Sequence, residues 1–311
     1  MSMSAAALPF NAQTRLLVVA PHPDDETLAA GVLLQRVLAV GGTVDVLLLT
    51  SGGNNPWPQR VLERRLHIDA AAQARWAARR QQEIQAALQT LGVPVGHLHA
   101  LDWPDMGLFD CLLQADGSAV ATLREWLRRL RPNLLVLPAL ADRHPDHGAA
   151  HVLLRLALAG MAEPPRICTY LVHAAAAAHA PIEVDATAAQ RETKLAALAQ
   201  HASQTALSGS RLRRLAAGAE RFDEPAPALV DGRLPWRPPV LLQPLLWLSV
   251  VDRCHVQSWH FSQAPLRRAT DGGGWQLTTP MPEQGGPRFA HLGLRVPSPW
   301  IFDLWGWCEI G

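Results

Sequence analysis

A cluster of one histidine and three acids, His22-Pro23-Asp24-Asp25-Glu26, is the part of the sequence best suited to chemistry. Such a composition is poor for a hydrophobic core. It does offer the nitrogen and oxygen ligands that zinc and similar divalent metals take from proteins. The competing interpretation is a solvated acidic loop that happens to contain a histidine. A second group of potential ligands elsewhere in the chain would favour the metal.

Such a group occurs over a hundred positions later, in the run His144-Pro145-Asp146-His147 that follows Asp142 and Arg143. Together the two clusters can supply two imidazoles and a carboxylate, and a catalytic zinc commonly has three protein ligands with one position open for water. Zinc lowers the pKa of that water to about 7. A carboxylate that is not bound to the metal can then take the proton from the water and give it to a leaving amine. The residues therefore favour metal-dependent hydrolysis of an amide.

Each cluster follows an apolar run and precedes a helical pattern. Residues 15–20 and 133–139 are apolar at consecutive positions, as strands of parallel sheets are. Helical patterns follow at residues 27–40 and 148–158. Because ligands bind beyond the carboxyl ends of parallel strands, the two clusters are expected to face the same crevice.

The rest of the first 207 residues continues this alternation of strand and helix. Residues 51–58 are rich in turn formers and are expected to be a loop. The alternation predicts a Rossmann-like, doubly wound α/β domain with a mostly parallel sheet over residues 1–207. The other predicted strands are 43–50, 96–101, 166–173 and 182–185, and the other predicted helices are 63–91 (one helix or two), 122–131 and 188–207.

Beyond residue 209 the composition changes. Five prolines between positions 225 and 239 indicate a connector, and helical periodicity then fades. We therefore predict that residues 208–311 form a Pro-rich connector and a Trp-rich, β-containing C-terminal appendage. Its tryptophans are expected to form its core rather than to stack on sugar rings. The apolar stretch 240–251 is expected to be a buried strand or helix, with peripheral contact to lipid as the alternative. The tryptophans of this region are Trp236, Trp247, Trp259, Trp275, Trp300, Trp305 and Trp307.

Charge and cysteine content exclude several classes of protein. A net charge of +1 and a pI near 7.9 give no support for nucleic-acid binding. The four cysteines form no CxxC motif, which favours reduced thiols and a cytoplasmic location. No secretory signal pattern is present, and no apolar run approaches the roughly 20 residues of a spanning helix. The sequence does not predict an oligomeric state.

The two clusters resemble the paired motifs of the LmbE-like, or PIG-L, zinc-dependent N-acetylglucosaminyl deacetylases, and the resemblance covers roughly residues 14–207. It implies that His22, Asp25 and His147 hold Zn²⁺ or another divalent metal such as Fe²⁺. It implies that Asp24 is the general base that later acts as acid. His144 would stabilise the tetrahedral oxyanion as an imidazolium, and Asp146 would hold a histidine in orientation.

Further positions match the same family. Arg80, in the run Arg80-Gln81-Gln82-Glu83, would contact the substrate, and Asp105 would contact the sugar or support the site. Lys194 and the run 201–204 resemble a family helix for which we expect a structural role. Some relatives place a tyrosine near the second motif, but the sole tyrosine here is Tyr170, so we assign no such role.

The leading hypothesis is removal of the N-acetyl group from an N-acetylated amino sugar or glycoconjugate. A second hypothesis keeps the metal but changes the amide, to that of a thiol-sugar conjugate or an antibiotic-like glycoside. A third, a non-catalytic sugar- or nucleotide-binding module, is disfavoured because neither GxGxxG nor a Walker sequence is present. His151 is expected to pack beside the site, and other single histidines such as His173 are expected to be surface or satisfied polar positions.

Overall fold

A computed structural model describes residues 8–114, 116–174, 182–269, 274–280, 285–295 and 301–311. The chain divides into two compact units. The first comprises Met1–Leu108, Leu130–Pro138 and Pro165–Glu224, and the second comprises Phe109–Arg129, Ala139–Pro164 and Pro225–Gly311. The functional division into residues 1–207 and 208–311 remains a prediction.

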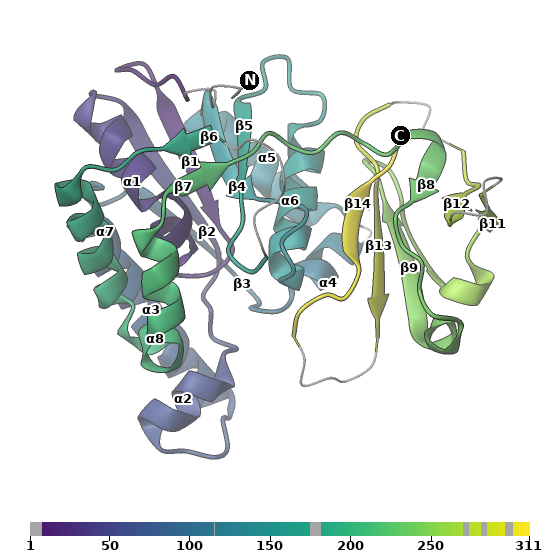
Figure 1. The fold of residues 1–311 in the computed structure, drawn as a ribbon, viewed down its shortest axis with the longest axis horizontal. Coiled ribbons are helices and arrows are strands. Elements are labelled where there is room, and N and C mark those ends of the chain that lie inside the picture. Colours follow the sequence, from purple (N-terminus) through teal and green to yellow (C-terminus); the bar gives the residue numbers. More distant parts are fainter. Residues whose placement is uncertain (1–7, 115, 175–181, 270–273, 281–284, 296–300) are drawn as a thin grey trace, which may run out of the picture. The chain divides into compact units, whose positions relative to one another are not determined.

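The first unit is built on a five-stranded sheet with the order β3-β2-β1-β4-β5, and all its strand pairs are parallel (Figure 1). The strand order reverses between β1 and β4, which is the mark of a doubly wound sheet. The predicted Rossmann-like fold class is therefore confirmed. The elements of this unit are β1 (Arg15–Ala20), α1 (Asp25–Ala39), β2 (Thr43–Thr50), α2 (Pro56–Glu63), α3 (Ala70–Thr90), β3 (Leu98–Trp103), β4 (Leu134–Pro138), β5 (Arg166–Tyr170), β6 (Ile182–Val184), α7 (Ala188–Gln200), α8 (Ala202–Ala217) and β7 (Glu220–Phe222).

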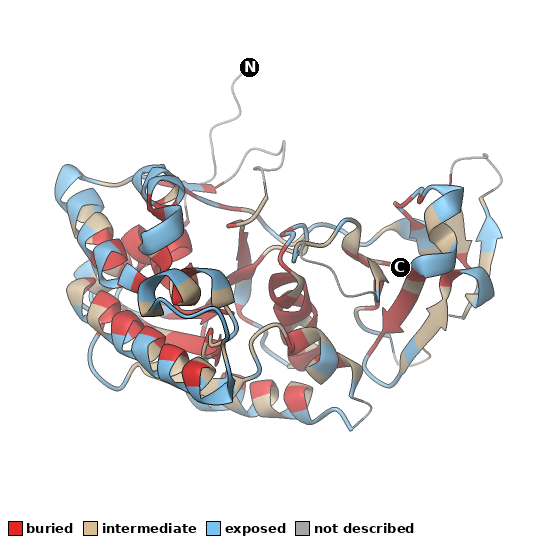
Figure 2. Ribbon diagram, turned by 90° about the horizontal axis from the view of Figure 1, so that it is seen from below, coloured by how far each residue is buried: buried red, intermediate tan, exposed pale blue. Residues whose placement is uncertain are grey.

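One hydrophobic core joins the sheet to α1, α3, α7 and α8. Leu16, Val18 and Ala20 on β1 pack with Val44 and Val46 on β2, and all five are buried. Alternate residues of a strand point to opposite faces, so these side chains define the face that the helices cover. Figure 2 shows the buried residues along the strands and on the inner sides of these helices. This core fixes the strand ends that carry the polar turns.

Several elements differ from the prediction. Helix α2 begins at Pro56 inside the stretch expected to be a loop, because proline is well tolerated in the first turn of a helix. The helix predicted over 188–207 is two helices, α7 and α8, that meet at His201 and continue to Ala217. Strand β6 pairs antiparallel with β7 instead of joining the main sheet.

The second unit contains antiparallel sheets. The larger has the order β10-β9-β13-β14 and the smaller the order β11-β12-β8. The β-containing C-terminal region is thus confirmed. The elements are α4 (Leu108–Leu113), α5 (Ser118–Leu130), α6 (Pro145–Leu158), η1 (Val230–Gly232), β8 (Arg233–Leu234), η2 (Val240–Leu245), β9 (Leu246–Val251), β10 (Val256–His260), η3 (Phe261–Gln263), β11 (Leu266–Arg268), β12 (Trp275–Leu277), β13 (Phe289–Leu294) and β14 (Gly306–Glu309).

Most of the described tryptophans of the C-terminal region contribute to its core. Trp236 is buried in an apolar cluster against which Trp259, Trp275 and Trp305 are partly buried, and Trp307 is buried as well. Trp247 is half-buried and does not belong to that cluster. Trp300 lies outside the described residues. The prediction for residues 240–251 holds only in part. Strand β9 is buried, but η2 is not, since Val240 and Leu241 are 72% and 89% exposed.

All four cysteines are free. Among the described residues, no helix combines the length and the apolar character needed to cross a membrane.

Candidate active site

The first polar turn joins β1 to α1 and is held by carboxylates on both sides of His22. The backbone N–H of His22 donates to Oδ2 of Asp25 (2.9 Å), and the same oxygen lies 3.4 Å from Nδ1 of the His22 ring. On the other side, Oδ1 of Asp105 lies 3.3 Å from Nε2 of His22. Burial alone would raise the pKa of Asp105, but the hydrogen bond with His22 and the charge of that ring outweigh it, so the pKa is lowered. Asp105 therefore supports the predicted ligand His22.

Asp24 occupies a strained position at the start of α1. Its φ of 128° lies in a region that non-glycine residues rarely adopt, and such strain is concentrated at functional sites. Burial raises the pKa of Asp24 to about 6, against the opposing effect of the Arg80 guanidinium, whose Nη2 lies 3.5 Å from Oδ1. A carboxyl with a raised pKa suits a group that must both take and give a proton.

Arg80 is buried beneath this turn. It is 3% exposed, and it donates from Nη1 to the carbonyl of Gly52 (2.9 Å) and from Nη2 to the carbonyl of Pro23 (2.6 Å). Gly52 has a φ of +65°, and a Cβ there would lie 2.1 Å from Nη1 of Arg80, so glycine is required. Through these contacts, Arg80 holds the backbone around Asp24 in place. Its contact with substrate remains a prediction.

The run 201–204 stabilises the helices that flank this turn. Nε2 of His201 lies 3.2 Å from Oε1 of Glu26, and the hydroxyl of Thr27 donates to the same oxygen (2.6 Å). The backbone N–H and hydroxyl of Ser203 donate to the two oxygens of Glu83 on α3 (2.9 and 2.5 Å). Burial would lower the pKa of His201, but the hydrogen bond and charge of Glu26 outweigh it and raise the pKa. The expected structural role is confirmed.

A buried ion pair is inserted into α1. Nζ of Lys194 donates to the carbonyl of Leu28 (2.9 Å) and to Oε1 of Glu220 (2.7 Å), and both charged side chains are 1% exposed. The carboxylate of Glu220 accepts the N–H groups of Val32 and Leu33 (2.6 and 2.9 Å). Both side chains thus form hydrogen bonds with the backbone of α1, the helix whose first turn carries Asp25, and hold this helix in place.

The second polar turn joins β4 to α6. Oδ1 of Asp142 accepts the backbone N–H of His144 (3.0 Å), and Oδ2 lies 3.3 Å from Nδ1 of His147. A carboxylate on one ring nitrogen orients the other nitrogen for a metal. The sequence interpretation missed this role of Asp142, although an acid two positions before His144 was a signal for it. The orienting role expected for Asp146 remains a prediction.

His144 is the N-cap residue of α6. Its Nδ1 accepts the backbone N–H of Asp146 (3.3 Å), which assigns the proton of the neutral ring to Nε2. The ring can therefore donate from Nε2 without being charged. An imidazolium, as the sequence suggested, would need a second proton on the nitrogen that already accepts this N–H group.

Residues of the C-terminal region hold the second turn from within the same unit. The backbone N–H of Asp303 donates to the carbonyl of Arg143 (2.8 Å), and the Phe302 ring stands edge-on to His144 with centroids 6.2 Å apart. On α6, a Cβ at Gly148 would lie 2.5 Å from Cδ1 of Trp307. These contacts join positions about 160 residues apart and could not be predicted from local sequence.

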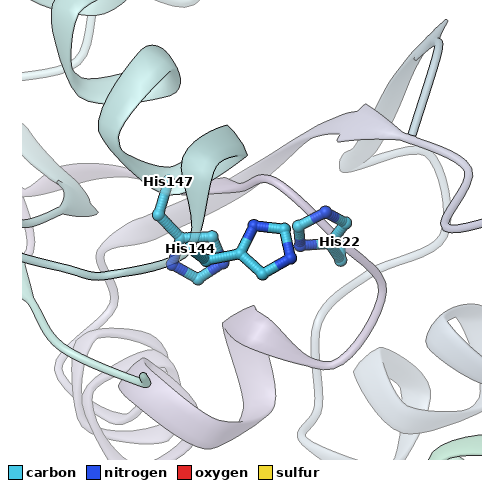
Figure 3. Close-up of side chains that lie close together, drawn as sticks. All are labelled: His22, His144 and His147. Carbon is cyan, nitrogen blue, oxygen red and sulfur yellow. The ribbon is translucent and has the colours of Figure 1, made fainter. Parts of the chain in front are cut away.

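The two turns follow β1 and β4, which are neighbouring parallel strands whose carboxyl ends lie at one edge of the sheet. One group of potential ligand atoms, from His22, His144 and His147, lies within 4.8 Å of one another (Figure 3). Two further groups that meet the same distance limit are Asp25, His147 and His173, and His22, Asp105 and Asp146.

This donor set fits a divalent metal. Its imidazole nitrogens and carboxylate oxygens are the ligands that zinc prefers. His22, Asp25 and His147 are all buried, where a positive ion would offset the clustered acids. His173 lies within the same distance limit of Asp25 and His147, and its Nδ1 also lies 3.5 Å from Nη2 of Arg211, as expected for a satisfied polar position.

Two other expectations concern residues beside the site. His151 is 1% exposed and packs edge-on to Phe289, with centroids 6.2 Å apart, as expected for a packing residue. The hydroxyl of Tyr170 donates to the carbonyl of Val19 (2.9 Å) from a buried position, which is consistent with assigning it no catalytic role.

The part of the chain that carries both polar turns is similar to known proteins. Residues 17–158, which contain both polar turns, match the family model described as PIG-L, GlcNAc-PI de-N-acetylase. These residues form a PIG-L family domain. A relative from Rhodococcus jostii (strain RHA1), named 1D-myo-inositol 2-acetamido-2-deoxy-alpha-D-glucopyranoside deacetylase, is 34% identical over 173 residues, which cover 49% of this chain and 56% of that protein. The chain thus spans about half the length of the curated relatives it matches.

Solved structures share the fold of the PIG-L domain. The conserved protein TT1542 from Thermus thermophilus is 29% identical with a TM-score of 0.52, and the match covers 73% of this chain and 100% of that one. The N,N'-diacetylchitobiose deacetylase from Pyrococcus horikoshii is 21% identical with a TM-score of 0.52, over 67% of this chain and 82% of that one. The latter likeness is one of fold alone.

Proposed function

We propose that this protein is a metal-dependent hydrolase that removes the N-acetyl group from an N-acetylated amino sugar or a glycoconjugate. The observation that carries the proposal is the group of histidines contributed by both polar turns of a PIG-L domain. The deacetylase names of the relatives are consistent with it.

His22, Asp25 and His147 are proposed to hold Zn²⁺, or another divalent metal such as Fe²⁺. Asp105 and Asp142 orient the two imidazoles through the contacts described above. When bound, such a metal would polarise the acetamide carbonyl and lower the pKa of a water molecule.

Asp24 is proposed to accept the proton of the attacking water and later to donate it to the departing amine. Its position next to a proposed ligand, its strained backbone and its contact with Arg80 support this assignment. His144 is proposed to donate from Nε2 to the oxyanion of the tetrahedral intermediate, as a neutral ring fixed by the N–H group of Asp146.

The remaining assignments concern substrate and location. Arg80 and Asp105 are proposed to contact the sugar in addition to their contacts within the protein. The substrate class is proposed from the amino-sugar names of the relatives. Four free thiols favour a reducing compartment, and we propose the cytoplasm.

The test is release of acetate and free amine from a panel of N-acetylated sugars that includes a glucosaminyl inositol and diacetylchitobiose. Metal-replete protein should deacetylate at least one member of the panel. The Asp24→Asn variant should keep its metal and lose roughly 10²- to 10⁴-fold in turnover, because it can no longer accept a proton.

The conservative change Asp110→Asn, on α4, is a matched control for a single lost carboxylate and should retain turnover. Wild-type rates in the Asp24→Asn variant would show that another group carries the proton. A protein that binds no divalent metal and releases no amine from any sugar would contradict the proposal as a whole.

A further inference from the structure

Helix α2 and the turn after it expose large apolar side chains. Trp57 is 62% exposed, Val61 56%, Leu62 41% and Leu66 91%. We call these four residues the α2 patch. Figure 1 shows α2 at the lower end of its unit, beyond the ends of α3 and α8. Large apolar groups gathered on one short helix point to an interaction surface.

The α2 patch belongs to an ordered helix. On the opposite side, Nε2 of the buried Gln59 donates to the carbonyl of Ala72 (2.7 Å) and to Oε1 of Glu63 (3.1 Å). Arg75 forms an ion pair with Glu63 (3.2 Å). These contacts fix the helix against α3, so its apolar residues are displayed rather than buried.

Basic side chains surround the α2 patch. Arg60 lies over the Trp57 ring, 5.1 Å from its centroid, and donates to the carbonyl of Leu66 (3.0 Å). Arg64 and Arg65 follow in the turn and are exposed. Glu63 is paired with Arg75, and the charge of Arg65 acts on the exposed Asp69, so the three arginines beside the apolar side chains outnumber the nearby acids.

The α2 patch is connected to the candidate active site. The backbone N–H of Asn54 donates to Oδ2 of Asp105 (2.7 Å), the residue that contacts His22. Nδ2 of Asn55, the residue before α2, donates to Oε1 of Gln204 (3.2 Å). A surface that holds α2 would therefore lie beside the edge of the sheet where the polar turns are.

We propose that α2 and the turn after it, residues 56–67, dock on an anionic lipid surface. Tryptophan and leucine insert at the boundary between headgroups and acyl chains, while arginines extend to phosphates. Anionic lipids attract such basic residues within a Debye length. The combination of exposed apolar and basic groups on one helix favours this occupant over a second copy of the chain, which would meet its own positive charge.

The experiment is flotation of the full chain with vesicles of phosphatidylcholine alone or with about 30% phosphatidylglycerol. The protein should float with the anionic vesicles and at least tenfold less with the neutral ones. Raising the salt concentration should release it, since screening weakens the attraction.

Two variants separate the apolar and the ionic parts of the interaction. Trp57→Ser combined with Leu66→Ser should lower partitioning onto anionic vesicles at least tenfold. Arg64→Gln combined with Arg65→Gln should lower it by about tenfold and remove most of the salt dependence. Val95→Ser is the matched control, because Val95 is 95% exposed but precedes the amino end of β3, and it should leave partitioning unchanged.

Each variant changes exposed side chains only, so thermal unfolding should match that of the wild type. Wild-type protein that stays with the unbound fraction would overturn the proposal. Equal losses in Val95→Ser and in the α2 variants would do the same. Flotation unaffected by the Trp57 and Leu66 changes, together with loss of self-association in sedimentation, would assign the α2 patch to a second copy of the chain instead.

Discussion

The two polar turns have similar sequences but are held in place by different interactions. The first turn rests on buried charge, with Arg80 beneath Asp24 and the pair of Lys194 and Glu220 inserted in α1. The second turn rests on its own helix cap and on the C-terminal region, through Asp303 and the packing of aromatic rings. The first half of the proposed site therefore rests mainly on buried ion pairs, whereas the second combines the buried contact between Asp142 and His147 with a helix cap and aromatic packing.

This difference gives the C-terminal region a role that its composition did not reveal. In the described part of the second unit, strand β14 meets α6 through an ion pair between Arg155 and Glu309 (2.8 Å) and through Trp307 beside Gly148. Residues 208–311 thus do more than follow the PIG-L domain, because they support one of its two polar turns. Variants that disturb charge and variants that disturb packing should distinguish the two arrangements.

The largest effect is expected from Lys194→Met. The change leaves the carboxylate of Glu220 buried without its cation, and it also removes the donor to the carbonyl of Leu28. Loss of one partner of a buried pair costs about 3–5 kcal/mol of unfolding free energy. Chemical denaturation measures this directly.

The control is Arg221→Met, which breaks an exposed ion pair with Glu183 next to the buried pair (2.8 Å). It should cost about 1 kcal/mol or less. If Lys194→Met were no more costly than this control, the first turn would not depend on buried charge.

A smaller effect is expected from Gly148→Ala on the packing side. The new methyl group would overlap Trp307, and overpacking of this kind costs about 1–3 kcal/mol. The control Gly209→Ala adds the same methyl group within α8, where the nearest atoms lie 3.7 Å away, and should be neutral or stabilising. A Gly148→Ala protein as stable as the wild type would show that α6 and Trp307 are not tightly packed.

The smallest effect is a pH dependence confined to the first turn. The pKa of His201 is raised in the folded state, so its contribution is fully present below the unfolded pKa of about 6.5 and is lost as the pH rises through the folded pKa. The difference in unfolding free energy between wild type and His201→Gln should therefore be largest below about pH 6.5 and should shrink as the pH rises above it. A difference that does not change with pH would mean that His201 is not protonated beside Glu26.

Local sequence predicted the parts of the fold that depend on local patterns. The apolar runs gave the bounds of β1 and β2, and the paired motifs marked the turns that follow the neighbouring strands β1 and β4. The break between α7 and α8 was not predicted because helix-forming residues continue through His201. The contact of His201 with Glu26 joins residues 175 positions apart, so it could not be predicted from local sequence.

Two contacts of the second turn were not predicted. Asp142 was a local signal that was overlooked, because its carboxylate contacts His144 and His147 within the same turn. The link from Asp303 to Arg143 depends on tertiary packing across 160 positions. Such contacts follow from the fold and not from the spacing of residues.

The central claim is that one metal ion is shared by the two polar turns, and the metal content of purified protein tests it most directly. Wild-type protein should carry one divalent ion per chain. His22→Ala, from the first turn, and His147→Ala, from the second, should each lose nearly all of it, because each variant removes a ligand from the same ion. Retention of a full equivalent of metal by either variant would contradict the account.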